Sequence, residues 1–231
     1  MASSPAASRP PADEVLAAAA QLGLSLDTAQ VGKLLHFLAL LQRWNATYNL
    51  TAVCDPAQML TQHLFDCLAV VEPLRRQLCT VVGKSVLDVG SGGGLPGVVL
   101  AVLEPELTVV CVDSVGKKAA FVTQVATELG LRNLRAVHSR VERMQGPGFD
   151  IVVSRAYAAL CDFASTTQNL LSEAGVWMAM KGRTPLDEME SLPATIDVFH
   201  VEQLRVPGLA AERCLVWMRR CYEPTAGLQG P

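Results

Sequence analysis

The hydrophobic positions along the chain change their period near residue 84. Before that point they recur every three or four residues, which is the spacing of one buried helix face. The pattern predicts three helical segments, over residues 13–22, 27–44 and 56–73. Asp27 is placed to cap the second of these helices. Residues 12–80 are therefore expected to form an N-terminal helical cap.

After residue 84, short apolar runs alternate with helical segments. This alternation is typical of a parallel sheet with helices on both faces. Seven strands are predicted, at residues 85–90, 107–112, 134–138, 149–153, 174–180, 196–204 and 213–219. Because only a short turn separates the last two, we expect an antiparallel hairpin at the sheet edge. The predicted fold class is α/β, with a seven-stranded, mostly parallel sheet.

Residues 81–222 are expected to form the main domain, between two flexible ends. Residues 1–11 are rich in Ala, Ser and Pro and are predicted to form a disordered tail, and residues 223–231 a second flexible tail. No apolar run reaches the roughly 18 residues that a membrane span needs. We therefore expect a soluble, cytoplasmic protein.

The formal net charge is −3, from 19 basic and 22 acidic residues, so no overall basic surplus indicates nucleic acid binding. RNA binding would need a local patch. The densest basic cluster contains Arg132, Arg135, Arg140 and Arg143, for most of which a solvated face is the alternative explanation. The seven cysteines include no C-x-x-C pair and the four histidines show no metal spacing, so we predict a reducing compartment and no metal.

A glycine-rich loop follows the first predicted strand, and an apolar segment that begins a helix follows the loop. Gly90, Gly92 and Gly94 allow the main chain to bend and to approach a ligand closely, because no Cβ intervenes. The amides of the next helix then face the gap. Such a crevice usually binds a cofactor that contains a nucleoside.

Asp113 ends the second predicted strand, about 25 residues after Asp88. In a βαβ unit this position is the tip of the neighbouring strand, where a carboxylate can accept hydrogen bonds from ribose hydroxyls. Capping of a helix that begins near Lys117 is a second role, and the two roles do not exclude each other.

Two cofactors fit this arrangement. Residues 92–97 satisfy the dinucleotide pattern G-x-G-x-x-G. Residues 88–94 resemble the D/E-x-G-x-G-x-G motif of class I methyltransferases, in which the strand-end acid and the loop surround the methionine part of S-adenosylmethionine. This motif favours a methyltransferase. An NAD-dependent oxidoreductase and a non-catalytic nucleotide-binding or RNA-binding module remain as alternatives.

Charged and aromatic residues near the strand ends are further candidates. Arg155 follows the fourth strand, where its partner is a cofactor carboxylate, an RNA phosphate or an internal carboxylate. Lys181 ends the fifth strand and Arg213 begins the last one. The segment from residue 42 to residue 51 is rich in aromatic and amide side chains, which either stack on bases or pack the cap onto the core.

Motifs that extend from about residue 15 to residue 219 occur together: Trp44-Asn45-x-x-Tyr48-Asn49-Leu50-Thr51, Asp55-Pro56, His63-x-x-Asp66, Asp88-Val89-Gly90-Ser91-Gly92-Gly93-Gly94-Leu95-Pro96-Gly97, Asp113-Ser114, Ser139-Arg140-Val141-Glu142, Ser154-Arg155-Ala156 and Lys181-Gly182. In this combination the chain resembles the bacterial ribosomal RNA small subunit methyltransferase G family, also called glucose-inhibited division protein B. The conjunction is far more specific than any single motif.

The resemblance implies a Rossmann-like class I fold that transfers a methyl group from S-adenosylmethionine to N7 of a guanine, position 527, in the 530 loop of 16S rRNA. The implied partner is 16S rRNA or a small-subunit particle, and we expect a monomer without membrane contact. Guanine N7 has an exposed lone pair and no proton, so we expect no general base. Catalysis should come from in-line positioning of the reacting atoms.

The expected cofactor residues come partly from the resemblance. It assigns cofactor contacts to Gly90, Leu95, Val141, Glu142 and Arg155. The loop and strand-tip arguments add Gly92, Gly94 and Asp113.

We expect RNA contacts from Trp44, Asn49, His63, Lys181 and Arg213, although a structural role is the alternative for His63 and for Trp44. Three residues depart from the family pattern and put details of RNA contact in doubt. These are Cys54, Gln62 and Cys214.

Overall fold

A computed structural model describes residues 11–155, 157 and 159–221 of the 231-residue chain. The two expected tails lie outside the described residues, except for Pro11, which begins the first helix. Within the described part of the chain, no helix has both the length and the apolar composition to cross a membrane.

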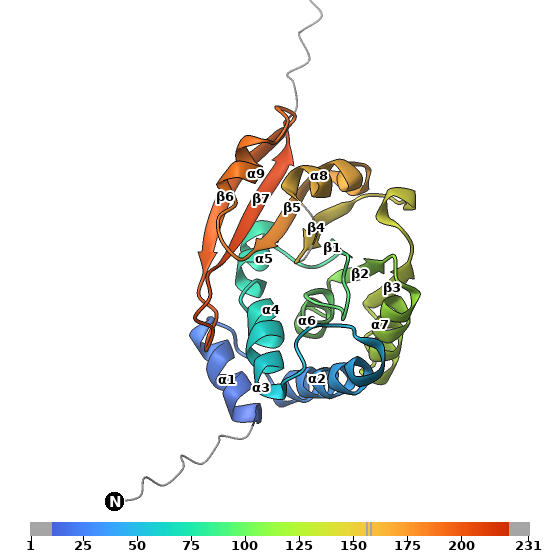
Figure 1. The fold of residues 1–231 in the computed structure, drawn as a ribbon, viewed down its shortest axis with the longest axis vertical. Coiled ribbons are helices and arrows are strands. Elements are labelled where there is room, and N and C mark those ends of the chain that lie inside the picture. The colour runs from blue at the N-terminus through green and yellow to red at the C-terminus, as the bar shows by residue number, and fades with distance from the viewer. Residues whose placement is uncertain (1–10, 156, 158, 222–231) are drawn as a thin grey trace, which may run out of the picture.

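The centre of the molecule is a seven-stranded sheet with the order β3-β2-β1-β4-β5-β7-β6 (Figure 1). Every neighbouring pair is parallel except for the two that involve β7, which is antiparallel to β5 and to β6. The predicted fold class and the edge hairpin are confirmed. The strands are β1 (Ser85–Val89), β2 (Thr108–Asp113), β3 (Leu134–His138), β4 (Phe149–Ser154), β5 (Leu171–Lys181), β6 (Ile196–Leu204) and β7 (Arg213–Arg220).

The central strands are apolar on both faces because both faces are covered. In β1, Val86 packs into the core on one side of the sheet, and Leu87 packs into the core on the other side. Helices α6 (Gly97–Leu103) and α7 (Gly116–Glu128) cover the first face, and α8 (Leu160–Thr167) covers the second. Helix α9 (Leu186–Glu190) packs beside α8.

The N-terminal helices form a further layer outside α6. They are α1 (Pro11–Gln21), α2 (Thr28–Tyr48), α3 (Pro56–Met59), the π-helical turn η1 (Leu60–Phe65), α4 (Asp66–Leu68) and α5 (Val71–Leu78). Asp27 caps α2 as predicted, since its side chain accepts from the Gln30 amide in a capping box. Helix α2 packs on both α6 and α7.

Two helix boundaries were predicted wrongly. Helix α2 continues through Tyr48, whereas the composition after Trp44 suggested that it ends there. The third segment breaks after Leu68, and α5 begins at Val71. Pro73 lies in the first turn of α5, where its missing N–H has no helical partner to lose.

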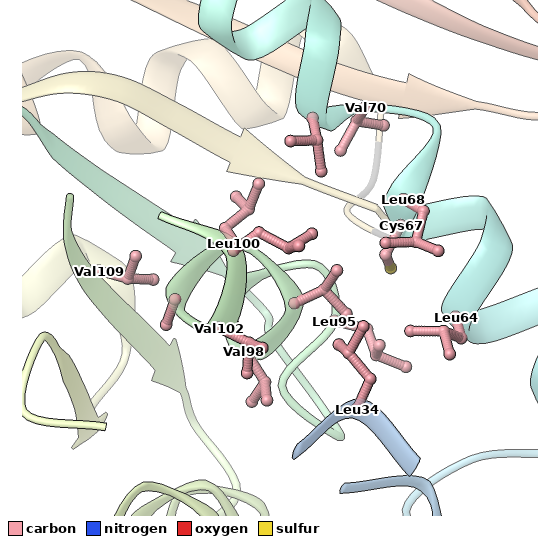
Figure 2. Packing of buried hydrophobic residues seen from close by; sticks show 14 of the residues in the cluster. Leu34, Leu64, Cys67, Leu68, Val70, Leu95, Val98, Leu100, Val102 and Val109 are labelled. Carbon is pink, nitrogen blue, oxygen red and sulfur yellow. The ribbon is translucent and has the colours of Figure 1, made fainter. Parts of the chain in front are cut away.

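Helix α6 is buried on every side. Figure 2 shows Leu95 and the side chains of α6 between Val109 of β2 and Leu34, Leu64 and Leu68 of the cap. Each fully buried Val or Leu side chain of this kind stabilises the fold by about 1.5–3 kcal/mol. A Cβ at Gly97 would collide with the Cys111 sulfur, so only glycine allows α6 to lie this close to the sheet.

Candidate cofactor cleft and its surroundings

A cleft of about 500 Å³ opens at the carboxyl ends of β1 and β2. Its wall continues into the turn η2 (Val141–Arg143), which follows β3. Crevices at this edge of a parallel sheet are the usual ligand sites of open α/β folds. The lining residues include apolar, anionic and cationic groups: Val89, Gly90, Val112, Asp113, Ser114, Val115, Lys118, Ser139, Arg140, Val141, Glu142 and Tyr157.

The glycine loop is fixed to the end of β2 by its backbone. The amides of Gly90 and Ser91 donate to the Val112 carbonyl at 2.9 and 3.2 Å, and the Gly92 amide donates to Asp113 Oδ2 at 3.0 Å. Gly90 and Gly92 have φ angles of +65° and +56°, which residues other than glycine rarely adopt. A Cβ built on Gly92 would meet only the Gly90 carbonyl, at 3.9 Å. The loop therefore presents bare backbone to the space beside it.

Gly94 and Leu95 lie on the inner side of the same loop. A Cβ at Gly94 would press against Val98 and Val122, and the Leu95 side chain is buried in the core. Neither of these residues, nor Gly92, is among the residues that line the cleft. The cofactor contact predicted for these two residues would have to come from their backbone.

Asp113 is 6% exposed and hydrogen-bonds to the backbone of two loops beside the cleft. Its Oδ2 accepts from the Gly92 amide, and its Oδ1 accepts from the Val115 amide at 2.8 Å. Each carboxylate oxygen keeps a second lone pair for a ligand hydroxyl. The alternative role as a helix cap is only approximate, because Val115 occupies the N-cap position of α7 and makes no side-chain bond there.

Asp88 lies beneath the loop and is completely buried. Its Oδ2 accepts from the Gly97 amide at 2.8 Å, while its Oδ1 has no partner among the described residues. Burial raises the pKa of this carboxyl to about 7. Asp88 does not line the cleft, so it supports the loop and the first turn of α6 from below.

Two of the expected cofactor residues, Val141 and Glu142, line the cleft. Val141 is buried and packs into the core on the α8 side of the sheet, and Glu142 is exposed. Tyr157 and Lys118 also belong to the wall, although neither residue is among the predicted site residues. Tyr157 packs on Phe163, with 5.6 Å between ring centroids, and its ring lies over Gly90. An aromatic residue shortly after a strand tip was the available signal. Ala156 of the same motif lies outside the described residues.

Arg155 belongs to a buried network that joins the helical cap to the sheet. Its Nη1 lies 3.6 Å from Asp66 Oδ2 and 3.2 Å from His63 Nδ1, and it donates to the Gln62 carbonyl. Arg213 donates from Nε to Asp66 Oδ1 at 2.8 Å. Of the three partners considered for Arg155, the structure contains the internal carboxylate. Burial raises the pKa of Asp66, against the opposing effect of the two arginines.

His63 is held at both ring nitrogens. Nε2 lies 2.8 Å from Thr51 Oγ1, and Nδ1 faces the Arg155 guanidinium. Arginine can only donate, so Nδ1 is the acceptor and Nε2 carries the proton. Burial, together with the Arg155 charge, lowers the pKa of His63 to about 4. His63 is therefore a neutral, buried residue, and its predicted RNA contact stays a prediction.

The Trp44 segment shows both of its expected features. Trp44 packs on Phe121 with ring centroids 5.4 Å apart, and on Tyr48 at 5.0 Å. Tyr48 is 41% exposed, and the exposed Asn49 ends α2 in the left-handed conformation with a φ of 49°. The buried residue is Asn45, whose Oδ1 accepts from the Thr51 amide at 2.8 Å. Stacking on RNA by Trp44 remains a prediction.

Lys181 forms an ion pair with Glu188 at 2.8 Å, and Glu188 also accepts from the Leu160 amide. Two of the three residues that depart from the family pattern are buried or partly buried in the protein. Gln62 supplies the carbonyl that Arg155 contacts, and Cys214 is buried in β7. The third, Cys54, is exposed beside Asn45. Among the residues that the structure describes, no group of three or more metal-binding side chains occurs.

Residues 30–216 match the family GidB, described as rRNA small subunit methyltransferase G. The chain is 58% identical to ribosomal RNA small subunit methyltransferase G of Acidovorax ebreus over 205 residues, which cover 86% of this chain and 90% of that protein. It is 56% identical to the protein of the same name from Paracidovorax citrulli over 224 residues, with 93% and 92% covered.

Solved structures with similar folds are more distant in sequence. TrmN from Thermus thermophilus matches with a TM-score of 0.53 and 18% identity, over 70% of this chain and 53% of that one. A SAM-dependent methyltransferase from Aquifex aeolicus matches with a TM-score of 0.51 and 17% identity, over 71% and 93%. These likenesses support the fold, and the close sequence matches establish the relationship: the chain belongs to the rRNA small subunit methyltransferase G family.

Proposed function

We propose that this protein transfers the methyl group of S-adenosylmethionine to N7 of a guanine in 16S rRNA. The observation that carries the proposal is the cleft at the carboxyl ends of β1 and β2, whose glycine loop is held by the Gly92–Asp113 hydrogen bond. Membership of the family favours the hypothesis of a methyltransferase over an NAD-dependent oxidoreductase and over a non-catalytic binding module.

The residues of the cleft fit an adenosine-containing cofactor. Gly90 lines the cleft beneath the Tyr157 ring, the backbone of Gly92 next to it has no side chain over it, and the carboxylates of Asp113 and Glu142 can accept hydrogen bonds from hydroxyl or amino groups. Val112 and Val141 add apolar wall suited to a planar base. When bound, S-adenosylmethionine supplies a methyl group activated by the positive sulfonium.

The chain acts by positioning. Among the described residues that line the cleft there is no histidine and no cysteine, and the reaction at guanine N7 requires no proton removal. His63 and Asp66 orient Arg155 through contacts within the protein, so the guanidinium is already fixed when a ligand arrives. We assign Arg155 to the cofactor carboxylate. Fixed geometry of this kind lowers the entropy that must be lost in the reacting complex.

The remaining assignments follow from the family. The substrate is 16S rRNA, presented free or in a small-subunit particle, and Trp44, Asn49, His63, Lys181 and Arg213 are the proposed RNA contacts. We further propose a monomer located in the cytoplasm. Sedimentation of the purified protein at micromolar concentration tests the monomer, and a dimer there would contradict it.

Two calorimetric titrations of the purified chain test the cofactor assignment, one with S-adenosylhomocysteine and one with NADH. Binding of the first alone is the expected result. If NADH alone binds, the assignment of the glycine loop to S-adenosylmethionine is wrong, and the proposed methyl transfer is contradicted as well. The second step is to incubate small-subunit particles that lack N7-methylguanine with the protein and S-adenosylmethionine. Chain cleavage at the labilised base then maps the product, and a methyl group on any other atom would contradict the proposed chemistry.

A further inference from the structure

The arginines of this chain differ in how they are engaged. Arg75, Arg76 and Arg219 hold ion pairs with carboxylates, as Arg155 and Arg213 do inside the site. Among the exposed arginines that hold neither an ion pair nor a side-chain hydrogen bond within the described part of the chain, four follow the end of a strand that points to the cleft. They are Arg140, Arg143, Arg183 and Arg205, called here the carboxyl-edge arginines.

The fold places these four on one edge of the sheet. Arg140 and Arg143 follow β3, Arg183 follows β5 and Arg205 follows β6. The strands β3, β5 and β6 all run in the same direction, because β6 is antiparallel to β7 and β7 is antiparallel to β5. Their carboxyl ends therefore share the edge that carries the cofactor cleft.

The arginines also flank the cleft from both sides. The strands β3 and β6 are the two outermost strands of the sheet, and the cleft lies at β1 and β2 between them. With neighbouring strands about 4.8 Å apart, the sheet is roughly 29 Å wide from β3 to β6. Arg140 itself lines the cleft, so this flank begins at the cofactor site.

The strand β3 also separates the four arginines that lie close together in the sequence into two pairs. Arg132 precedes β3 and Arg135 is its second residue, whereas Arg140 and Arg143 follow the strand. Since a strand rises about 3.3 Å per residue, the two pairs lie toward opposite edges of the sheet. Only the second pair belongs to the edge with the cleft.

We propose that the carboxyl-edge arginines bind backbone phosphates of a folded RNA on both sides of the target base, an inference that rests on the proposed function. Guanidinium groups bind phosphate in a bidentate manner, and exposed groups without a partner can do so without the loss of an existing ion pair. Lys181 and Arg213, in contrast, would have to leave Glu188 and Asp66. A wide pair of flanks suits a folded RNA domain more than a single strand in one groove.

Nearby carboxylates limit the reach of these charges. Glu142 lies between Arg140 and Arg143, and Asp187 follows Arg183 by four positions. The flanks therefore act through local contact with phosphates and produce little long-range attraction, which agrees with the net charge of −3. The arginines position the RNA, and they do not select its sequence.

The test compares two double variants with the same change in charge. Arg143→Glu with Arg205→Glu removes one arginine from each flank, and Arg132→Glu with Arg135→Glu is the matched control at the other side of β3. We expect the first to raise the KM for small-subunit particles by about tenfold or more, with kcat and the Kd for S-adenosylhomocysteine within about twofold. The control should change KM by less than about twofold. Circular dichroism confirms that both variants are folded.

A salt series gives an independent readout. If Arg143 and Arg205 each bind a phosphate, the slope of log KM against log salt should fall by about 0.7 to 0.9 per lost contact in the glutamine variants R143Q and R205Q. The proposed phosphate binding by the carboxyl-edge arginines would be contradicted if the test and control pairs had equal effects. It would also be contradicted if KM and the salt slope stayed unchanged in the test variants. Either result would leave the proposed function intact. A wild-type protein that methylates no particle would instead overturn the proposed function, and the flanks with it.

Discussion

Gly92 combines a left-handed backbone, a hydrogen bond to Asp113 and a bare outer side. Gly92→Val should lower the affinity for S-adenosylhomocysteine by at least about tenfold, because a branched side chain fills the space beside the loop and the positive φ costs about 1–2 kcal/mol for a residue with a Cβ. Titration calorimetry measures the loss.

Gly130 provides the matched control for backbone strain. Its φ is +63°, and a Cβ there would meet nothing within 4 Å. It precedes β3 on the edge opposite the cleft, so Gly130→Val should destabilise the protein to a similar degree and leave cofactor affinity within about twofold. An equal loss of affinity in both variants would show that strain, and not the cleft, accounts for the effect at Gly92.

His63 makes stability sensitive to acid. Its pKa is about 4 in the folded protein and near 6.5 when unfolded, so the unfolded chain binds more protons between these values. The free energy of unfolding should therefore fall as the pH decreases from about 6.5 to 4. His63→Asn should show a shallower slope over this window in urea unfolding at several pH values. An unchanged slope would contradict the neutral, buried state.

Asp88 acts in the opposite direction. Burial raises its pKa from the usual 3.8 to about 7, so the folded protein holds the proton over a range where the unfolded chain has lost it. This group therefore lowers the free energy of unfolding as the pH rises from about 4 to 7. Asp88→Asn keeps an acceptor for the Gly97 amide and should remove this decline. An unchanged profile in the variant would show that the carboxyl is already ionised in the folded protein over this range.

At the scale of elements, Asp66 fastens the cap segment η1–α4 to β4 and to β7. Asp66→Ala should destabilise the fold by about 3 kcal/mol, because Arg155 and Arg213, only 23% and 24% exposed in their side chains, would lose their carboxylate. Asp197→Ala, which removes the exposed pair with Arg219, should cost less than about 1 kcal/mol. Equal losses in denaturant unfolding would contradict the structural role of the Asp66 network.

The sheet was predictable because its strands are buried on both faces and read as continuous apolar runs. Element ends were less predictable where tertiary packing replaced local signals. Helix α2 extends to Tyr48, whose ring packs on Trp44 one turn earlier, and Trp44 in turn packs on Phe121, a contact that no local pattern reveals. Strand β5 begins at Leu171, three residues before the predicted start, in a stretch where Ser172, Glu173 and Ala174 show no apolar alternation.

The candidate site was predictable where it depends on local backbone and unpredictable where it depends on distant pairing. The glycines and Asp113 are close in the folded chain because a βαβ unit brings consecutive strand tips together. The pairing of Asp66 with Arg213 joins residues 147 positions apart, and nothing in the sequence distinguishes this arginine from Arg183 or Arg205. The sequence therefore indicated Arg155, Lys181 and Arg213 at the strand ends, without showing that each of them pairs with a carboxylate of the protein.

At the scale of the whole molecule, cofactor binding and folding are linked. S-adenosylhomocysteine at 100 times its Kd should raise the free energy of unfolding by about 2.7 kcal/mol, since the cleft requires β1, β2 and η2 together. The increase is measured by urea unfolding with and without ligand. Gly92→Val should show almost none of it. A similar increase with NADH would contradict the selectivity of the cleft.

The long-range bond between Asp66 and Arg213 also sets an order of events during translation. Strands β1 to β5 can pair as they leave the ribosome, whereas β7 must enter between β5 and an already synthesised β6. At about 5–20 residues per second, Arg213 follows Asp66 by roughly 7 to 30 s. Arg155 is synthesised earlier, so Asp66 can pair first with Arg155 and gains Arg213 last. The strands that carry the cofactor cleft can therefore form early, whereas the contact that joins the helical cap to β7 forms last.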